Sequence, residues 1–155
     1  MKRIFLLILV PVIILKSGCT DKINPEFNAQ NLRCEYMKEA VVEKTSPRFS
    51  WELVSTQNHQ FQTAWQLIVS DKVGDIEENK GTVWDSKKRN GNESFGIKWK
   101  GNKLQSFTQY YWKVRVWDRD GNVSRWSETA SFLTGAFNET DLNANWIGDE
   151  PEPPL

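Results

Sequence analysis

The fold of this chain is decided by the stretch YYWKVRVWD at residues 110–118. Its side chains fall into two alternating sets: Tyr110, Trp112, Val114 and Val116 in one, Tyr111, Lys113, Arg115 and Trp117 in the other. Successive side chains of a β-strand point to opposite faces of a sheet, so this period of two predicts a strand. We expect the first set to face a hydrophobic core.

The same period of two extends in both directions from this strand. We expect strands at 32–36, 48–53, 62–70, 82–86, 95–99, 110–118 and 129–134. Turn signals such as Asn90-Gly91-Asn92 and Asp120-Gly121-Asn122 separate them, and the polar stretch 71–81 is expected to be a loop with at most a helical turn. No amphipathic helix is evident. The pattern predicts an all-β domain, a β-sandwich of about seven short strands.

The first 18 residues have the pattern of an export signal. Lys2 and Arg3 precede an apolar run from Ile4 to Leu15, about 12 residues long, whereas a membrane-spanning helix needs about 20. The run ends at Lys16-Ser17-Gly18-Cys19, which resembles the lipobox of bacterial lipoproteins, although Lys16 departs from that motif. We expect a lipoprotein signal peptide at 1–18 and lipidation of Cys19; the alternative is ordinary secretory cleavage near Gly18.

These features predict the organisation of the chain. A tether at 19–31 is expected to lead into a sandwich at 32–135, and 136–155 is expected to be a linker toward a missing next domain. The protein is expected to be exported and anchored in a membrane, in the periplasm or at the cell surface. Cys34 alternates within the first expected strand, which predicts a small buried side chain rather than a nucleophile.

Charge and motifs exclude several classes of function. The chain has 20 basic and 20 acidic residues, and no basic stripe of the kind that nucleic-acid binding needs. Asp118, Asp120 and Glu128 are candidates for an acid–base pair, but aspartates beside a turn commonly bond the local backbone. The same turn lacks the distal Glu of a calcium loop, and His59, the single histidine, lies in a polar turn. We therefore expect no metal, no cofactor and no catalytic residue.

Aromatic side chains outside the expected core are the stronger candidates for binding. Tyr111 and Trp117 lie on the opposite face of their strand, and Trp126 follows in the next loop. Trp faces stack on sugar rings, so these three residues could bind a plant or bacterial glycan. The alternatives are a contact with a neighbouring domain, or a cation–π ladder of Trp and Arg that covers the sheet.

The segment LQSFTQYYWKVRV, residues 104–116, resembles the E–F corner of fibronectin type III domains. In that corner a Leu lies six residues before a Tyr, whose hydroxyl bonds upstream backbone. Tyr110 matches this tyrosine. The resemblance implies a fibronectin type III/immunoglobulin-like β-sandwich.

A narrower resemblance rests on seven ordered blocks. They are LRCEY (32–36), PRFSW (47–51), AWQLIV (64–69), VWDS (83–86), YYWKVRVWD (110–118), FLTG (132–135) and NWIG (145–148). Together they resemble the opening of bacterial α-L-rhamnosidases of glycoside hydrolase family 78. This implies an N-terminal sandwich that precedes further β-domains and an (α/α)6 catalytic barrel.

The resemblance also implies an activity for a parent enzyme. It implies inverting hydrolysis of terminal α-L-rhamnosides by two carboxylates, held about 6.5–9.5 Å apart, and it places both in the barrel. The leading hypothesis is a non-catalytic N-terminal module of a lipoprotein α-L-rhamnosidase, a fragment whose partners are the downstream domains. The alternatives are a free-standing carbohydrate-binding module and a purely structural surface module.

Overall fold

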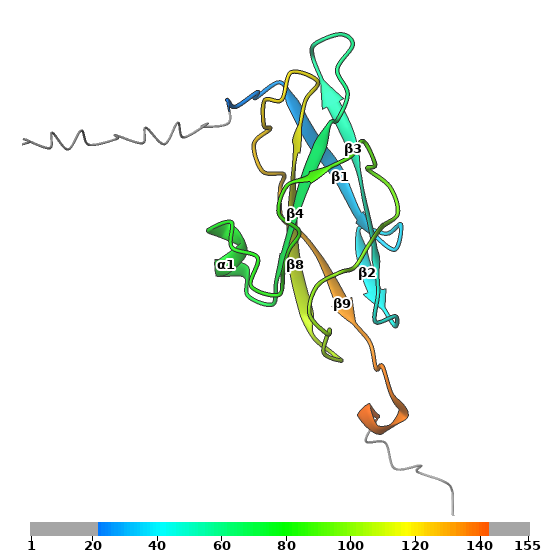
Figure 1. Ribbon diagram of the computed structural model, residues 1–155. Helices are drawn as coiled ribbons and strands as arrows, with labels where there is room; N and C mark the ends of the chain where they lie inside the picture. The colour runs from blue at the N-terminus through cyan, green and yellow to red at the C-terminus, as the bar shows by residue number, and fades with distance from the viewer. Residues whose placement is uncertain (1–21, 143–155) are drawn as a thin grey trace, which may run out of the picture.

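The computed structural model describes residues 22–142, which form a β-sandwich (Figure 1). Its strands are β1 (Phe27–Cys34), β2 (Glu39–Val42), β3 (Arg48–Ser55), β4 (Ala64–Ser70), β5 (Trp84–Asp85), β6 (Arg89–Asn90), β7 (Ile97–Lys98), β8 (Gln109–Trp117) and β9 (Ala130–Thr134). A short helix α1 (Val73–Glu77) and a 3-10 turn (Glu139–Asp141) complete the elements. The fold class expected from the sequence is confirmed.

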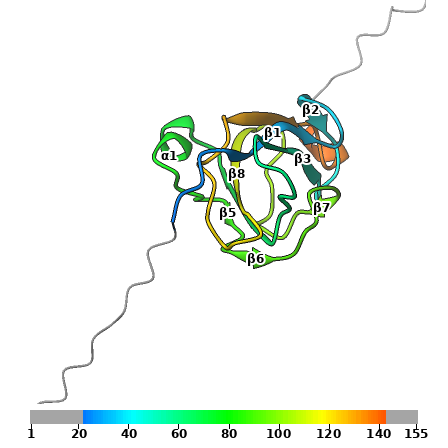
Figure 2. The ribbon, with the colours of Figure 1, turned by 90° about the horizontal axis from the view of Figure 1, so that it is seen from above.

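The strands form two sheets that face each other, as the view down the long axis shows (Figure 2). One sheet has the order β1-β3-β7. The other has the order β2-β9-β8-β4-β5, with β6 also paired to β4. All these pairings are antiparallel except that between β2 and β9, which is parallel. β8 therefore lies at the centre of its sheet, between β9 and β4.

The core lies between the sheets and is rich in aromatic rings. The inward set of β8, Tyr110, Trp112, Val114 and Val116, is at most 2% exposed, as the alternation predicts. From the other sheet, Phe49 contributes a ring whose centroid lies 4.8 Å from that of Trp112 and 5.7 Å from that of Phe132. Edge-on ring pairs of this kind stabilise a core beyond the area that they bury.

The E–F corner has the geometry that the resemblance implies. The Tyr110 hydroxyl accepts a hydrogen bond of 2.9 Å from the backbone N–H of Gln105. Leu104 beside it is buried. The side chain of Tyr110 therefore holds the loop before β8 to the strand itself.

The tether predicted at 19–31 is wrong for the residues that the structure describes. Strand β1 begins at Phe27, and the chain already pairs with Val123 at Ile23. Phe27 and Ala29 are buried core residues, so apolar side chains hold this segment to the sandwich. Residues 19–21 lie outside the described range, as do the predicted signal peptide at 1–18 and residues 143–155 of the predicted linker.

Two short strands and one turn also differ from expectation. β2 and β6 are absent from the predicted set, and β1 ends at Cys34 rather than at Tyr36. Tyr36 instead lies in a tight turn, exposed and with a φ of 70°. Among residues 22–142, no helix is long and apolar enough to span a membrane.

Candidate functional site

The three aromatic residues expected to be open for binding differ in their exposure in the structure. Trp117 is only 1% exposed, in a small cluster with Ala64 and Val123. Its proposed role as an open sugar platform is therefore wrong, because its ring is covered. Tyr111 and Trp126 are half-buried.

A cation–π ladder occupies this face of β8. The guanidinium of Arg115 lies 5.2 Å from the ring centroid of Trp117 and 4.8 Å from that of Trp126. The Lys88 ammonium, from the segment between β5 and β6, lies 4.5 Å from the ring centroid of Trp117. Arg115 also donates a hydrogen bond of 2.9 Å from Nε to Gln66 Oε1. Cations over aromatic faces are attracted by the ring quadrupole. The ladder therefore stabilises the packing of side chains on this face of the sheet.

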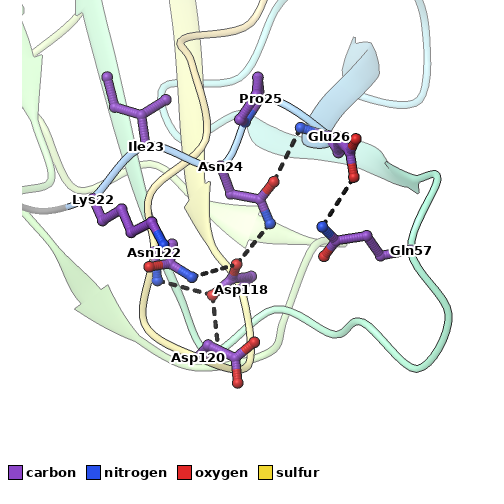
Figure 3. A pocket seen from close by; sticks show the side chains of 9 residues that line it. All are labelled: Lys22, Ile23, Asn24, Pro25, Glu26, Gln57, Asp118, Asp120 and Asn122. Carbon is purple, nitrogen blue, oxygen red and sulfur yellow. Dashed lines mark hydrogen bonds between the residues drawn. The ribbon is translucent and has the colours of Figure 1, made fainter.

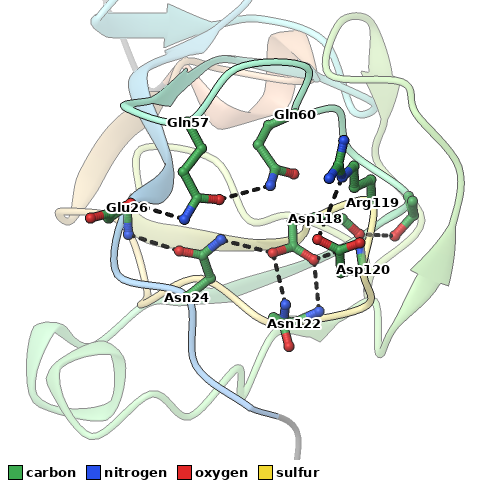
Figure 4. Close-up of polar contacts among 9 residues, drawn as sticks. Asn24, Glu26, Gln57, Gln60, Asp118, Arg119, Asp120 and Asn122 are labelled. Atoms are coloured by element: carbon green, nitrogen blue, oxygen red, sulfur yellow. Dashed lines mark hydrogen bonds and ion pairs between the residues drawn. The ribbon is translucent and has the colours of Figure 1, made fainter.

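The carboxylate of Asp118 organises the turn after β8 (Figure 4). Its Oδ1 accepts hydrogen bonds from the backbone N–H groups of Asp120 and Asn122, at 2.9 and 2.8 Å. Its Oδ2 accepts from Nδ2 of Asn24 at 2.8 Å and from Nδ2 of Asn122 at 3.1 Å. Asp118 is 0% exposed, and all four donors come from the protein. The carboxylate therefore serves to tie the turn to the incoming chain.

The pKa of Asp118 reflects this environment. Burial acts to raise the pKa, but the side-chain hydrogen bonds from Asn24 and Asn122 and the backbone donors of Asn122 and Asp120 outweigh it and lower it from its ordinary value. A general acid for glycoside cleavage needs a raised pKa. Asp118 thus has the opposite electrostatic character, as the turn-bonding interpretation of its sequence context predicts.

A cavity of about 410 Å³ opens beside this turn (Figure 3). Its lining combines the incoming segment, one residue from the loop between β3 and β4, and the turn: Lys22, Ile23, Asn24, Pro25, Glu26, Gln57, Asp118, Asp120 and Asn122. Asn24 bonds Asp118 on one side and, through Oδ1, accepts the Glu26 N–H at 3.0 Å. Many of the polar groups that line the cavity are hydrogen-bonded to one another. The cavity therefore lies where chain segments are held together, and it offers few free polar groups to a ligand.

The other residues singled out in the sequence have structural places. Cys34 is a buried free thiol whose pKa is raised to about 12, by burial and then by the charge of Glu35. His59 and Glu128 are exposed. In residues 22–142, no group of three or more His, Cys, Asp and Glu side chains is arranged to hold a metal ion. Cys19 lies outside the described residues.

The residue that sequence reasoning missed here is Asn24. It was assigned to the tether, yet its side chain is one of the four donors to Asp118, 94 positions away. The signal available in the sequence was the Asn-Pro pair at 24–25, which favours turn formation.

Comparison with known proteins identifies this sandwich. A family model described as "Rha78A-like, N-terminal immunoglobulin domain" matches residues 29–138. An α-L-rhamnosidase of Formosa agariphila is 35% identical over 107 residues, covering 68% of this chain and 11% of the relative. One of Streptomyces avermitilis is 32% identical over 114 residues, 73% of this chain and 11% of the relative. The chain thus spans about a tenth of the length of the relatives that it matches.

Solved structures agree with the sequence matches. The α-L-rhamnosidase from Dictyoglumus thermophilum superposes with a TM-score of 0.76 at 36% identity, over 84% of this chain and 14% of that one. That of Streptomyces avermitilis, complexed with L-rhamnose, gives 0.74 at 30% identity, over 79% and 12%. The matched region in each relative is a small, non-catalytic part of a glycoside hydrolase. The chain belongs to the family of Rha78A-like N-terminal immunoglobulin domains found in α-L-rhamnosidases.

Proposed function

We propose that this sandwich is the N-terminal module of an exported, lipid-anchored α-L-rhamnosidase, in which it spaces and supports the downstream hydrolase domains. The observation that carries the proposal is the match itself. It covers the N-terminal immunoglobulin domain and about a tenth of each rhamnosidase. The remaining nine tenths of such a protein would supply the catalytic carboxylates and the rhamnoside specificity.

The path of the chain supports a spacer role. The chain joins the sandwich beside Asp118, at the end of β8, where Asn24 bonds that carboxylate. It leaves beside Ser106, just before β8, where the Ser106 hydroxyl donates to Asp141 at 2.6 Å. Figure 1 shows these two points at opposite ends of the long axis. A nine-residue strand spans about 25–30 Å, so the module would hold a membrane anchor and a downstream domain about that far apart.

The proposed lipid anchor is attached to Cys19. Two or three apolar chains on an N-terminal cysteine give a much more durable membrane attachment than one. Between Cys19 and the first paired residue, Ile23, only three residues intervene. The lipid would therefore hold the Asp118 end of the sandwich close to the membrane and direct the other end away from it.

Fractionation tests the anchor. Cys19→Ala should move the protein from the membrane fraction to the soluble fraction, and metabolic labelling with a radioactive fatty acid should be lost. Cys34→Ala is the matched control, because the thiol of Cys34 is buried, and it should leave both readouts unchanged. Membrane association that persists in Cys19→Ala would contradict the anchor.

The genomic neighbourhood tests the parent enzyme. The coding sequence that follows the codon for Leu155 should continue, in frame or after a frameshift, into further β-domains and a helical barrel. A stop codon followed by a terminator and unrelated genes would contradict the parent enzyme and favour a free-standing module.

A further inference from the structure

A groove of about 380 Å³ lies on the side of the sandwich where the edges of the two sheets meet. It is lined by Trp65, Trp84, Arg89, Asn90, Glu93, Phe95, Gly96, Ile97, Lys98 and Lys100. Trp65, Trp84, Arg89 and Asn90 belong to β4, β5 and β6 of one sheet, and Ile97 and Lys98 to β7 of the other. The other four lie in the chain segments on either side of β7. Small-molecule sites commonly have volumes of about 300–1,000 Å³ and combine apolar walls with a few polar groups, and this groove has both properties.

The aromatic floor of the groove is held rigidly by the core. Trp84 is 8% exposed, and its ring meets that of Trp99 edge-on at a centroid distance of 5.1 Å. Trp65 is half-buried and lies 5.8 Å from Trp51, whose Nε1 donates to Gln62 at 3.0 Å. Rings fixed in this way lose little conformational entropy when a ligand binds against them.

The rim of the groove is an exposed phenylalanine supported by a strained turn. Phe95 is 67% exposed, and its ring stacks on that of Tyr36 at 5.3 Å. Tyr36 and its neighbour Glu35 both have left-handed backbone, with φ of 70° and 44°, which costs free energy for residues with a side chain. The surrounding structure must therefore hold this turn in place.

Arg48 is the group that holds the turn. The Glu35 carboxylate accepts hydrogen bonds from Arg48 N at 2.8 Å and from Arg48 Nη2 at 2.9 Å. The same guanidinium lies 4.9 Å from the Tyr36 ring centroid. The strained turn thus fixes Tyr36 beneath Phe95 and keeps a large apolar ring open to solvent at the rim of the groove. Strain retained at such a place is typical of binding sites.

The charge around the groove is positive, although the chain as a whole is neutral. Arg89, Lys98 and Lys100 are exposed, and within the described part of the chain none of them forms an ion pair or a side-chain hydrogen bond. Glu93 is the single acidic residue among those that line the groove. Cations that no neighbouring carboxylate neutralises are available to a ligand that brings negative charge.

We propose that this groove binds an acidic oligosaccharide, with a sugar ring against Phe95 and its carboxylate or sulfate ester against Lys98 and Lys100. Aromatic faces suit the apolar face of a pyranose ring, and the three cations suit an anionic substituent. Glu93 supplies an acceptor for sugar hydroxyls. The site is distinct from Tyr111, Trp117 and Trp126, and it needs neither the lipid anchor nor a hydrolase partner.

Calorimetry with matched sugars tests the ligand class. Tetragalacturonate and its carboxyl-reduced form, and a sulfated tetrasaccharide and its desulfated form, are titrated into the purified full chain at low salt. We expect an acidic member of one pair to bind with a dissociation constant below about 1 mM and at least tenfold more tightly than its neutral partner, as one charge-assisted hydrogen bond provides. The pair that shows the difference identifies the anion as carboxylate or sulfate.

Surface variants place the binding. Phe95→Ala and the double variant Lys98→Gln/Lys100→Gln should each weaken binding about tenfold or more. Phe61→Ala and Lys72→Gln are the controls, because both residues are exposed and lie outside the groove, and they should bind as the unmodified chain does. Circular dichroism should show that all four variants are folded.

Three results would overturn the proposal. One is equal binding of acidic and neutral sugars, or of none, up to about 10 mM, a weak limit on the affinity scale. Another is binding that survives both groove variants. The third is tighter binding of a single-stranded oligonucleotide than of either acidic sugar, since stacked bases and phosphates would use the same rings and cations. None of these results bears on membrane fractionation or on the coding sequence downstream.

Discussion

At the scale of single residues, the most consequential group is the carboxylate of Asp118. It is buried and bonded by four donors, so its charge contributes to stability only while it is ionised. Asp118→Asn should lower the free energy of unfolding at pH 7 by about 1–3 kcal/mol, because the amide cannot accept all four bonds. Urea unfolding measures this difference.

The pH dependence of the same group follows from its lowered pKa. The folded pKa lies below the unfolded one, so the stabilisation is present above the unfolded value, near 3.9, and is lost as the pH falls through the folded value. Unfolding titrations below pH 4 should therefore show a smaller loss of stability in Asp118→Asn than in the unmodified chain. Asp120→Asn is the control, since its exposed side chain forms an ion pair with Arg119. An equal effect of the two changes would contradict this role.

The tyrosine corner gives a second residue-scale prediction. Tyr110→Phe removes the acceptor of the Gln105 N–H and leaves that donor unpaired, which should cost about 1–3 kcal/mol in chemical unfolding. Tyr111→Phe is matched to it, because its hydroxyl has no hydrogen-bond partner among the described residues. A loss for Tyr111→Phe as large as that for Tyr110→Phe would refute a special role for the corner.

At the scale of elements, the two faces of strand β8 have different structural roles. Its inner face builds the core, and its outer face carries the ladder of Trp117, Arg115 and Trp126. Trp117→Ala should destabilise the fold by about 3–5 kcal/mol, as for other buried Trp side chains. Trp126→Ala should cost much less in thermal unfolding, because Trp126 is half-buried. Equal losses would mean that the ladder, rather than burial, dominates.

The long strands were predictable from sequence. Which side chains from other segments cover the outer faces of these strands was not. Alternation assigns a side chain to a face, so it gave the inward set of β8 correctly. It cannot show that Val123 and Ala64, from other segments, cover Trp117. Strand β2 was missed because an exposed position of it holds an apolar side chain, Val41, which hides the alternation. Strand β6 was missed because both of its residues are polar and exposed.

The candidate site was less predictable than the fold. The groove draws on residues from Trp65 to Lys100, and its rim depends on Tyr36, which was expected to lie in a strand. A turn with two left-handed residues normally contains Asn or Gly. Glu35-Tyr36 carries neither, so local sequence gave no signal of the turn that positions Phe95.

At the scale of the whole molecule, the sandwich matches the N-terminal immunoglobulin domain of α-L-rhamnosidases and spans about a tenth of the length of those relatives. We expect the purified chain to release no nitrophenol from a chromogenic α-L-rhamnoside above the rate of the buffer. Spectrophotometry at 400 nm would detect it, with a rhamnosidase of the same family as positive control. Turnover that co-purifies with the chain and is lost in Glu128→Gln would contradict the non-catalytic assignment.

The parallel pairing of β2 with β9 has a mechanical consequence. The two strands share four register pairs, from Glu39↔Ser131 to Val42↔Thr134, and β9 is the last strand before the described chain leaves the sandwich. Tension between the two ends of the module pulls β9 along its own axis, past β2. The backbone hydrogen bonds between these strands are then loaded together, in shear, and do not break one after another. A sandwich joined in this way resists extension, which suits a link that is held at one end and drawn at the other.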